Sequence, residues 1–220
     1  MLNRRRVMGG GGSLPYDAEI EYLEGTGTQW IDTGLYFDTT KHGYIVDATL
    51  INDIAGTVTI CGTWEGPWDI NYLNCAMAGN YQSKYFSCPP INFRGGSAGE
   101  ALSSPNIRSV IGFINHGLSD RVINITRYVN GVSSSITMSN PYIGISLQTF
   151  PIFGMKGDGK NIVSEISHLK LYGFKMYDGD IVILALIPVR VGTIGYMYDK
   201  VSKQLFGNAG TGDFILGPDK

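Results

Sequence analysis

The feature that most constrains this chain is a series of short segments in which apolar and polar residues alternate, each closed by a turn. Residues 122–129 and 132–138 show it best, because they flank Asn130-Gly131. That dipeptide favours a two-residue hairpin turn, which needs positive φ at both central positions. No window has the 3.6-residue period of an amphipathic helix. The pattern therefore predicts an all-β protein with no helix longer than two turns.

Composition supports the same fold class. Glycine accounts for 30 of 220 residues and charged residues for only 16%, while aromatic residues reach 11%. Such a chain can bury a substantial core and is unlike a disordered segment. Residues 62–106 have loop composition, and Pro188 and Pro218 are expected at strand ends. Further strands are expected at residues 19–23, 29–32, 44–51, 57–61, 107–114, 162–176, 181–189, 194–198 and 204–206.

The N-terminus differs from the rest of the chain. Residues 1–13 contain Arg4, Arg5 and Arg6, then the four glycines Gly9, Gly10, Gly11 and Gly12, and no acidic residue. We expect a basic, flexible arm at 1–13 that anchors the protein to a partner, and a folded domain at 14–220. Because all 19 acidic and only 14 basic residues lie in that domain, its net charge is −5. We therefore expect no nucleic-acid partner.

Several features indicate synthesis in a reducing cytoplasm without export. The longest apolar run, residues 181–189, is too short to span a bilayer, and no apolar segment follows the three arginines. Cys61, Cys75 and Cys88 are odd in number and lack metal-binding spacing. They are expected to be free thiols. No membrane association is expected.

Two stretches carry a resemblance to a known family. They are LPYDAEIEYLEGTGTQWIDTG at residues 14–34, and IPVR at 187–190 with GYMYDKVSKQLFGNAGTGDF at 195–214. They resemble the opening and closing motifs of concanavalin A-like (laminin-G-like) jelly-roll domains, which are common in bacteriophages of gut bacteria and in surface proteins of those bacteria. The resemblance covers about residues 16–217. It implies a two-sheet antiparallel jelly-roll sandwich but no single activity.

Candidate catalytic groups are few. Jelly-roll glucanases similar to this fold use a Glu-x-Asp-x-x-Glu strand, and Glu19, Glu21 and Glu24 have a comparable spacing. Retaining hydrolysis needs two carboxyl groups about 5 Å apart. Here the central Asp is replaced by Glu, and the segment lies at the first strand. Solvent-facing charges that protect a strand edge explain these residues better, and no enzyme is predicted.

Metal and cofactor sites are not predicted either. His42, His116 and His168 are scattered along the chain, so no His pair has metal-ligand spacing. Residues 158–161 (DGKN) and 178–180 (DGD) cluster oxygen ligands that calcium could use, but both also fit ordinary turns. Calcium stays open as a minor alternative, and no other cofactor is expected.

Aromatic residues crowd one irregular region and are the main candidates for ligand binding. Sugars pack their C–H faces on exposed rings while amide groups bond the hydroxyls. The alternative is that these rings cap the sandwich or pack at a subunit contact. Trp30, in the family motif, is expected in the core. The candidate glycan-binding residues are Trp64, Trp68, Tyr72, Tyr81 and Tyr85, with Asn71 and Asn80.

Together these features predict a non-enzymatic phage virion component, a head- or tail-associated decoration or fibre protein. It would attach to other virion proteins through residues 1–13, display a lectin-like jelly roll and adhere weakly to host surface polysaccharide. We expect a homo-oligomer, with a trimer as the specific guess, because assembly covers exposed sheet edges. The alternatives are a free or cell-surface carbohydrate-binding module and, third, a glycoside hydrolase.

Overall fold

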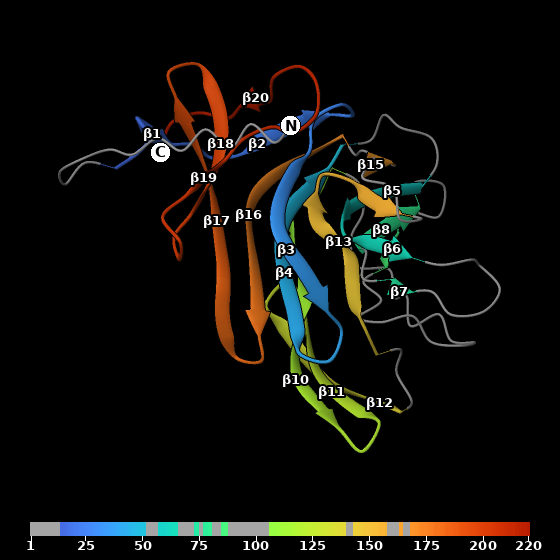
Figure 1. Cartoon of the computed structure of the whole chain (residues 1–220). Coiled ribbons are helices and arrows are strands. Elements are labelled where there is room, and N and C mark those ends of the chain that lie inside the picture. The colour runs from blue at the N-terminus through green and yellow to red at the C-terminus, as the bar shows by residue number, and fades with distance from the viewer. Residues whose placement is uncertain are drawn as a thin grey trace.

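The computed structural model confirms the all-β class and the sandwich (Figure 1). It describes residues 14–51, 57–65, 73–74, 77–80, 85–87, 106–139, 143–157, 163–164 and 168–220. Those ranges contain no helix, and so none that is long and apolar enough to cross a membrane.

The strands, in chain order, are β1 (Ala18–Glu19), β2 (Leu23–Thr26), β3 (Ile31–Asp38), β4 (His42–Leu50), β5 (Thr57–Cys61), β6 (Thr63–Glu65), β7 (Leu73–Asn74), β8 (Met77–Asn80), β9 (Tyr85–Ser87), β10 (Ser109–Ser119), β11 (Val122–Val129), β12 (Val132–Ser139), β13 (Ile145–Ile152), β14 (Met155–Gly157), β15 (Val163–Ser164), β16 (His168–Asp178), β17 (Ile181–Val191), β18 (Ile194–Asp199), β19 (Leu205–Phe206) and β20 (Ile215–Leu216).

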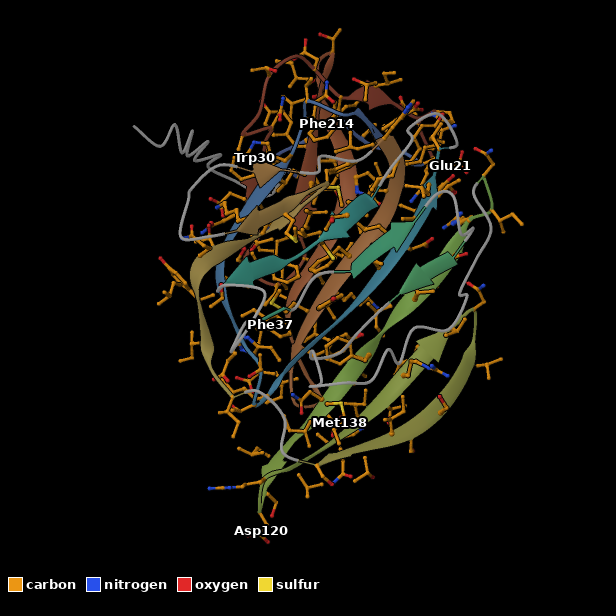
Figure 2. All side chains as sticks on the ribbon, turned by 90° about the vertical axis from the view of Figure 1, so that its right-hand side faces the viewer. Glu21, Trp30, Phe37, Asp120, Met138 and Phe214 are labelled. Carbon is orange, nitrogen blue, oxygen red and sulfur yellow. The ribbon has the colours of Figure 1, made fainter. Side chains whose placement is uncertain are left out.

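Two antiparallel sheets form the layers of the sandwich. The large sheet has the order β12-β11-β10-β4-β16-β17-β18-β19; in addition, β1 pairs with β17, and β2 pairs with β16 and β20. The five-stranded sheet has the order β3-β13-β5-β8-β9 and lies in front of the large sheet in Figure 2. A third, small sheet, β15-β14-β6-β7, contains a parallel pair between β6 and β14 that the sequence did not indicate.

Aromatic rings from both layers meet in the core. Tyr44 on β4 contacts Phe113 on β10, with ring centroids 5.1 Å apart, within the large sheet. It also contacts Phe150 on β13 of the opposite sheet, at 5.3 Å, and Phe150 stacks on Phe37 of β3 at 5.4 Å. All four rings are buried. The strand expected at residues 44–51 is thus confirmed as β4, and its alternate residues Tyr44, Val46, Ala48 and Leu50 all belong to the core.

The two motifs behind the family resemblance pack against each other at one end of the sandwich. The Asn208 side-chain oxygen accepts hydrogen bonds from the backbone N–H groups of Trp30, at 3.1 Å, and Gly210, at 2.8 Å. The Gln29 amide donates to the carbonyl of Asp213 at 3.1 Å. The motifs therefore close the fold by tying its first and last segments together, and Trp30 packs against the core as expected.

A buried ion pair connects β3 with β14. The Lys156 side chain is 2% exposed, and its Nζ lies 3.0 Å from Oδ2 of Asp32. The ammonium also donates to the Thr149 hydroxyl and lies 5.0 Å from the centre of the Trp30 ring. Burial alone would raise the pKa of Asp32, but hydrogen bonds from Gly34, Thr149 and Lys156, together with the Lys156 charge, outweigh it and lower that pKa.

This pair predicts a pH-dependent contribution to stability. We expect Asp32→Asn to lower the free energy of unfolding at pH 7 by about 2–4 kcal/mol, because it leaves the buried Lys156 charge without its counter-ion. Since the folded-state pKa of Asp32 is lowered, the stabilisation is complete above the unfolded-state pKa of about 3.9 and is lost as the pH falls through the folded-state pKa.

Urea unfolding between pH 7 and pH 3 measures this difference between wild type and variant. The difference should shrink below about pH 4. As a control, Asp32→Asn combined with Lys156→Met removes both charges and should cost less than Asp32→Asn alone. A difference that stays constant over the whole pH range would contradict the assignment.

Candidate functional site

One row of residues crosses the outer face of the large sheet, the face turned away from the five-stranded sheet. Strand register places Lys175 of β16 opposite Ile45 of β4, and Ile45 opposite Gly112 of β10. Gly112 in turn lies opposite Tyr128 of β11, and Tyr128 opposite Ser133 of β12. The row thus has a low centre, made of an isoleucine and a glycine, between a lysine and a tyrosine.

The neighbouring row repeats the arrangement. Tyr177 of β16 lies opposite Gly43 of β4. A Cβ on Gly43 would come within 2.9 Å of the Cα of Ile114 on β10, so these two residues are adjacent. Ile114 lies opposite Thr126 of β11, and Thr126 opposite Ser135 of β12. We call the outer-face residues of these two rows the tyrosine face: Gly43, Ile45, Gly112, Ile114, Thr126, Tyr128, Ser133, Ser135, Lys175 and Tyr177.

Glycine is required at both low positions of the tyrosine face. A Cβ on Gly112 would lie 2.1 Å from the carbonyl oxygen of Tyr44, and one on Gly43 would lie 2.5 Å from that of Phe113. These distances are far below van der Waals contact. With a larger residue at either position, β4 and β10 could not lie as close together as they do. Because these two positions carry no side chain, Ile45 and Ile114 are the only side chains of β4 and β10 in these two rows, between the larger residues of β16 and β11.

The three largest polar side chains of the tyrosine face have no hydrogen-bond or ion-pair partner among the residues that the structure describes. They belong to Tyr128 and Tyr177, which end in hydroxyls, and to Lys175, which ends in an ammonium group. Burial raises the pKa of the Tyr177 phenol, and the nearby Tyr128 phenol raises it further. The Tyr177 phenol therefore stays neutral at pH 7 and can donate a hydrogen bond.

The border of the tyrosine face is polar. His116 Nε2 lies 2.8 Å from the Thr126 hydroxyl, and its Nδ1 lies 3.4 Å from Oδ1 of Asp180. These contacts hold the imidazole at the edge of the face. The Thr137 hydroxyl donates to the Asn124 side chain at 2.9 Å on the neighbouring strands. Hydroxyl, amide and imidazole groups thus surround the two tyrosines.

A second aromatic group on the same sheet differs because its members engage one another. Arg108 forms two hydrogen bonds to Asp47, both 2.8 Å, and its guanidinium carbon lies 3.9 Å from the centre of the Tyr172 ring. The Tyr172 ring contacts Tyr22 edge-on at 5.6 Å, and Lys170 lies over Tyr22 at 4.4 Å. These groups stabilise the sheet and offer less to a ligand than the tyrosine face does.

The glycan-binding residues expected from the sequence fall mostly outside the described part of the chain. Trp68, Asn71, Tyr72 and Tyr81 lie outside the described residues, as do Arg4, Arg5, Arg6 and Gly9–Gly12 of the arm. For Trp64, Asn80 and Tyr85 only the strand backbone is described.

That backbone brings together two of the seven expected residues. Asn80 of β8 lies directly opposite Tyr85 of β9, whereas Trp64 belongs to β6 in the third sheet. These short strands also correct the expectation that residues 62–106 form loops, since β6 to β9 lie within that stretch.

The glutamates of the first segment have separate partners. Glu19 on β1 accepts a hydrogen bond from the Tyr16 hydroxyl at 3.3 Å. Glu24 on β2 lies 3.0 Å from Nε2 of His168 and 3.8 Å from Nζ of Lys170. β1 pairs with β17 whereas β2 pairs with β16, so the Glu19–Glu24 segment is divided between two strand neighbours.

Metal-ligating clusters are absent from the described residues: no three His, Cys, Asp or Glu side chains there lie close enough to hold an ion. Asp178, one of the possible calcium ligands, pairs instead with Lys41 at 2.6 Å. Residues 158–161, the other candidate, lie outside the described part. Cys61 is a buried free thiol.

Comparisons with known proteins support the fold. No known family matches the chain, and no curated protein sequence matches it. A solved structure does: a protein of Bacteroides ovatus described as a "putative carbohydrate binding protein". The two are 12% identical with a TM-score of 0.54, over 92% of this chain and 61% of that one. The chain thus spans about three fifths of that structure and shares its fold.

Proposed function

We propose that this chain is a non-enzymatic carbohydrate-binding module that holds its ligand on the tyrosine face. The observation that carries the proposal is the group formed by Tyr128, Tyr177 and Lys175, whose polar ends have no partner among the described residues. A ring with an unused hydroxyl offers a sugar both an apolar surface and a hydrogen-bonding group. The fold shared with the Bacteroides ovatus protein agrees with such a role.

The chemistry of binding follows from the two rows. The C–H face of a sugar ring would pack on Tyr128 or Tyr177, above the low centre made by Ile45 and the two glycines. Sugar hydroxyls would bond the phenols, the Lys175 ammonium and the hydroxyls of Ser133 and Ser135 on β12. Each aromatic contact contributes about 0.5–1.5 kcal/mol beyond its buried area. A single face of this kind therefore binds in the millimolar range, at about −4 kcal/mol.

The proposal assigns binding without catalysis. Three carboxylates close in sequence to residues of the tyrosine face or its border are each engaged by a basic side chain: Asp47 by Arg108, Asp178 by Lys41 and Asp180 by His116. Glycoside hydrolysis uses two carboxyl groups on either side of the scissile bond. The face presents aromatic rings, hydroxyls and an ammonium, which bind sugars without cleaving them.

Weak binding gains strength when many copies act together. We propose that residues 1–13 attach the module to other proteins of a phage virion, made in the host cytoplasm, and that the jelly roll faces the host surface. The basic, glycine-rich composition of the arm and the family resemblance support this assignment. Many copies on one particle raise the avidity about 10²–10⁴-fold. A free or cell-surface module is the alternative setting for the same face.

The binding prediction compares matched tyrosines. We expect Tyr128→Ala and Tyr177→Ala each to weaken binding about three- to tenfold, because each removes a packing surface and a hydroxyl. Tyr36→Ala is the control: Tyr36 is 52% exposed but lies on β3 of the five-stranded sheet. Multivalent display on an array of bacterial surface glycans identifies the ligand, and titration calorimetry with the best-bound one measures the affinity.

The same array decides between the two candidate locations. If Trp64→Ala and Trp68→Ala abolish binding while Tyr128→Ala and Tyr177→Ala do not, the ligand binds in the region expected from sequence and the tyrosine face is wrong. If folded wild-type protein binds no glycan at all, the carbohydrate function is wrong.

The arm prediction is tested by truncation. Deletion of residues 1–13 should leave a folded domain with unchanged circular dichroism and unchanged glycan binding, because no expected core strand lies in that segment. The truncated protein should fail to join phage particles in a complementation assay. Incorporation at the wild-type level would place the attachment elsewhere in the chain.

A further inference from the structure

One long edge of the large sheet is unprotected in the described part of the chain. β12, Val132–Ser139, ends the sheet and pairs with β11 alone among the described strands. Figures 1 and 2 show it at the margin of the molecule. An edge strand presents a row of backbone N–H and C=O groups to which another strand can bond.

β12 lacks the features by which proteins normally block such an edge. Its sequence, VSSSITMS, contains no charged residue, no proline and no glycine. Its eight residues pair with β11 without a register shift, so no bulge bends it away. The strands at the other ends of the three sheet orders are different: β7, β9, β15 and β19 have only two or three residues each, and β3 has irregular pairing and a positive φ of 70° at Gly34.

The turn before β12 determines which backbone groups face outward. Asn130-Gly131 is a two-residue turn with Val129 opposite Val132. Residues that flank such a turn bond to each other, and bonded and non-bonded pairs then alternate along the hairpin. Ser133, Ser135 and Thr137 consequently direct their N–H and C=O groups away from β11, toward the free edge.

We propose that β12 pairs antiparallel with β12 of a second copy of this chain, joining the two large sheets into one. Identical strands without charge meet no like-charge repulsion, and serine and threonine side chains opposite one another pair well across strands. Val132, 70% exposed, lies on the strand that the partner would cover. An eight-residue strand pair buries less than the roughly 1,200–2,000 Å² of stable complexes, so we expect a dimer in the micromolar range.

The pairing has a consequence for the tyrosine face, which rests on the proposed function. The two-fold axis of an antiparallel pair is perpendicular to the sheet, so both tyrosine faces look in the same direction. Tyr128 lies one strand from β12, so three strand spacings, about 14 Å, separate the two copies of Tyr128 in the direction across the strands. One polysaccharide chain could then contact both faces. The dimer itself does not depend on glycan binding.

The edge is tested with variants at Ser135 of the full chain. Ser135→Pro removes an outward N–H without removing a bond to β11, and Ser135→Lys places like charges across the seam. Sedimentation velocity over about 1–200 µM should show wild type passing from 24.0 kDa toward twice that mass. Both variants should raise the dimer dissociation constant about tenfold or more. Ser135→Thr, which keeps the N–H, should dimerise like wild type.

Amide hydrogen exchange of wild type checks the same edge without a substitution. The amides of Ser133, Ser135 and Thr137 should exchange more slowly at high protein concentration than at low concentration, whereas that of Ser134, bonded to β11, should change little. A monomer over the whole range would overturn the proposal. So would a trimer, or a dimer that folded Ser135→Pro and Ser135→Lys proteins form as well as wild type. Each result is independent of whether any glycan binds.

Discussion

The contact between the aromatic rings of the two sheets is the interaction on which the rest of the structure depends. Tyr44 contacts Phe150 across the sandwich, and Phe150 stacks on Phe37. Because Tyr44 must face inward, Gly43 and Ile45 on either side of it must face outward. Removal of one such buried ring costs about 3–5 kcal/mol. The core therefore both stabilises the fold and places the centre of the tyrosine face.

Local patterns predicted much of this fold. The hairpin at Asn130-Gly131 and the strand β4 were expected from the sequence and are present. Pro188 was expected at a strand end but lies inside β17. Its carbonyl accepts a hydrogen bond from the backbone N–H of Ile20 beside β1. The proline nitrogen, which carries no hydrogen, points to the same side, so the β17–β18 ladder loses no hydrogen bond. β6 to β9, β13, β14 and β20 were missed. In β13 the polar residues Ser146 and Gln148 are buried and the apolar Leu147 is 77% exposed, the reverse of the usual alternation.

The tyrosine face could not be predicted from the sequence because strand order decides it. Tyr128 and Tyr177 are about fifty residues apart in the chain. They belong to the same face of the large sheet because its strand order leaves only β4 and β10 between β16 and β11. Each tyrosine alone is an ordinary half-buried strand residue. The available signals were two glycines within strands, Gly43 and Gly112, since glycine in a strand often marks a close backbone approach.

The most direct test of the account is NMR of the full chain with ring-labelled tyrosine, titrated with the best-bound oligosaccharide. The 13 tyrosines include two on the proposed face and suitable references elsewhere. The account predicts that the ring signals of Tyr128 and Tyr177 shift along one saturating curve, while those of Tyr36 and Tyr172 stay in place. Saturable shifts confined to other tyrosines, with Tyr128 and Tyr177 unchanged, would contradict it.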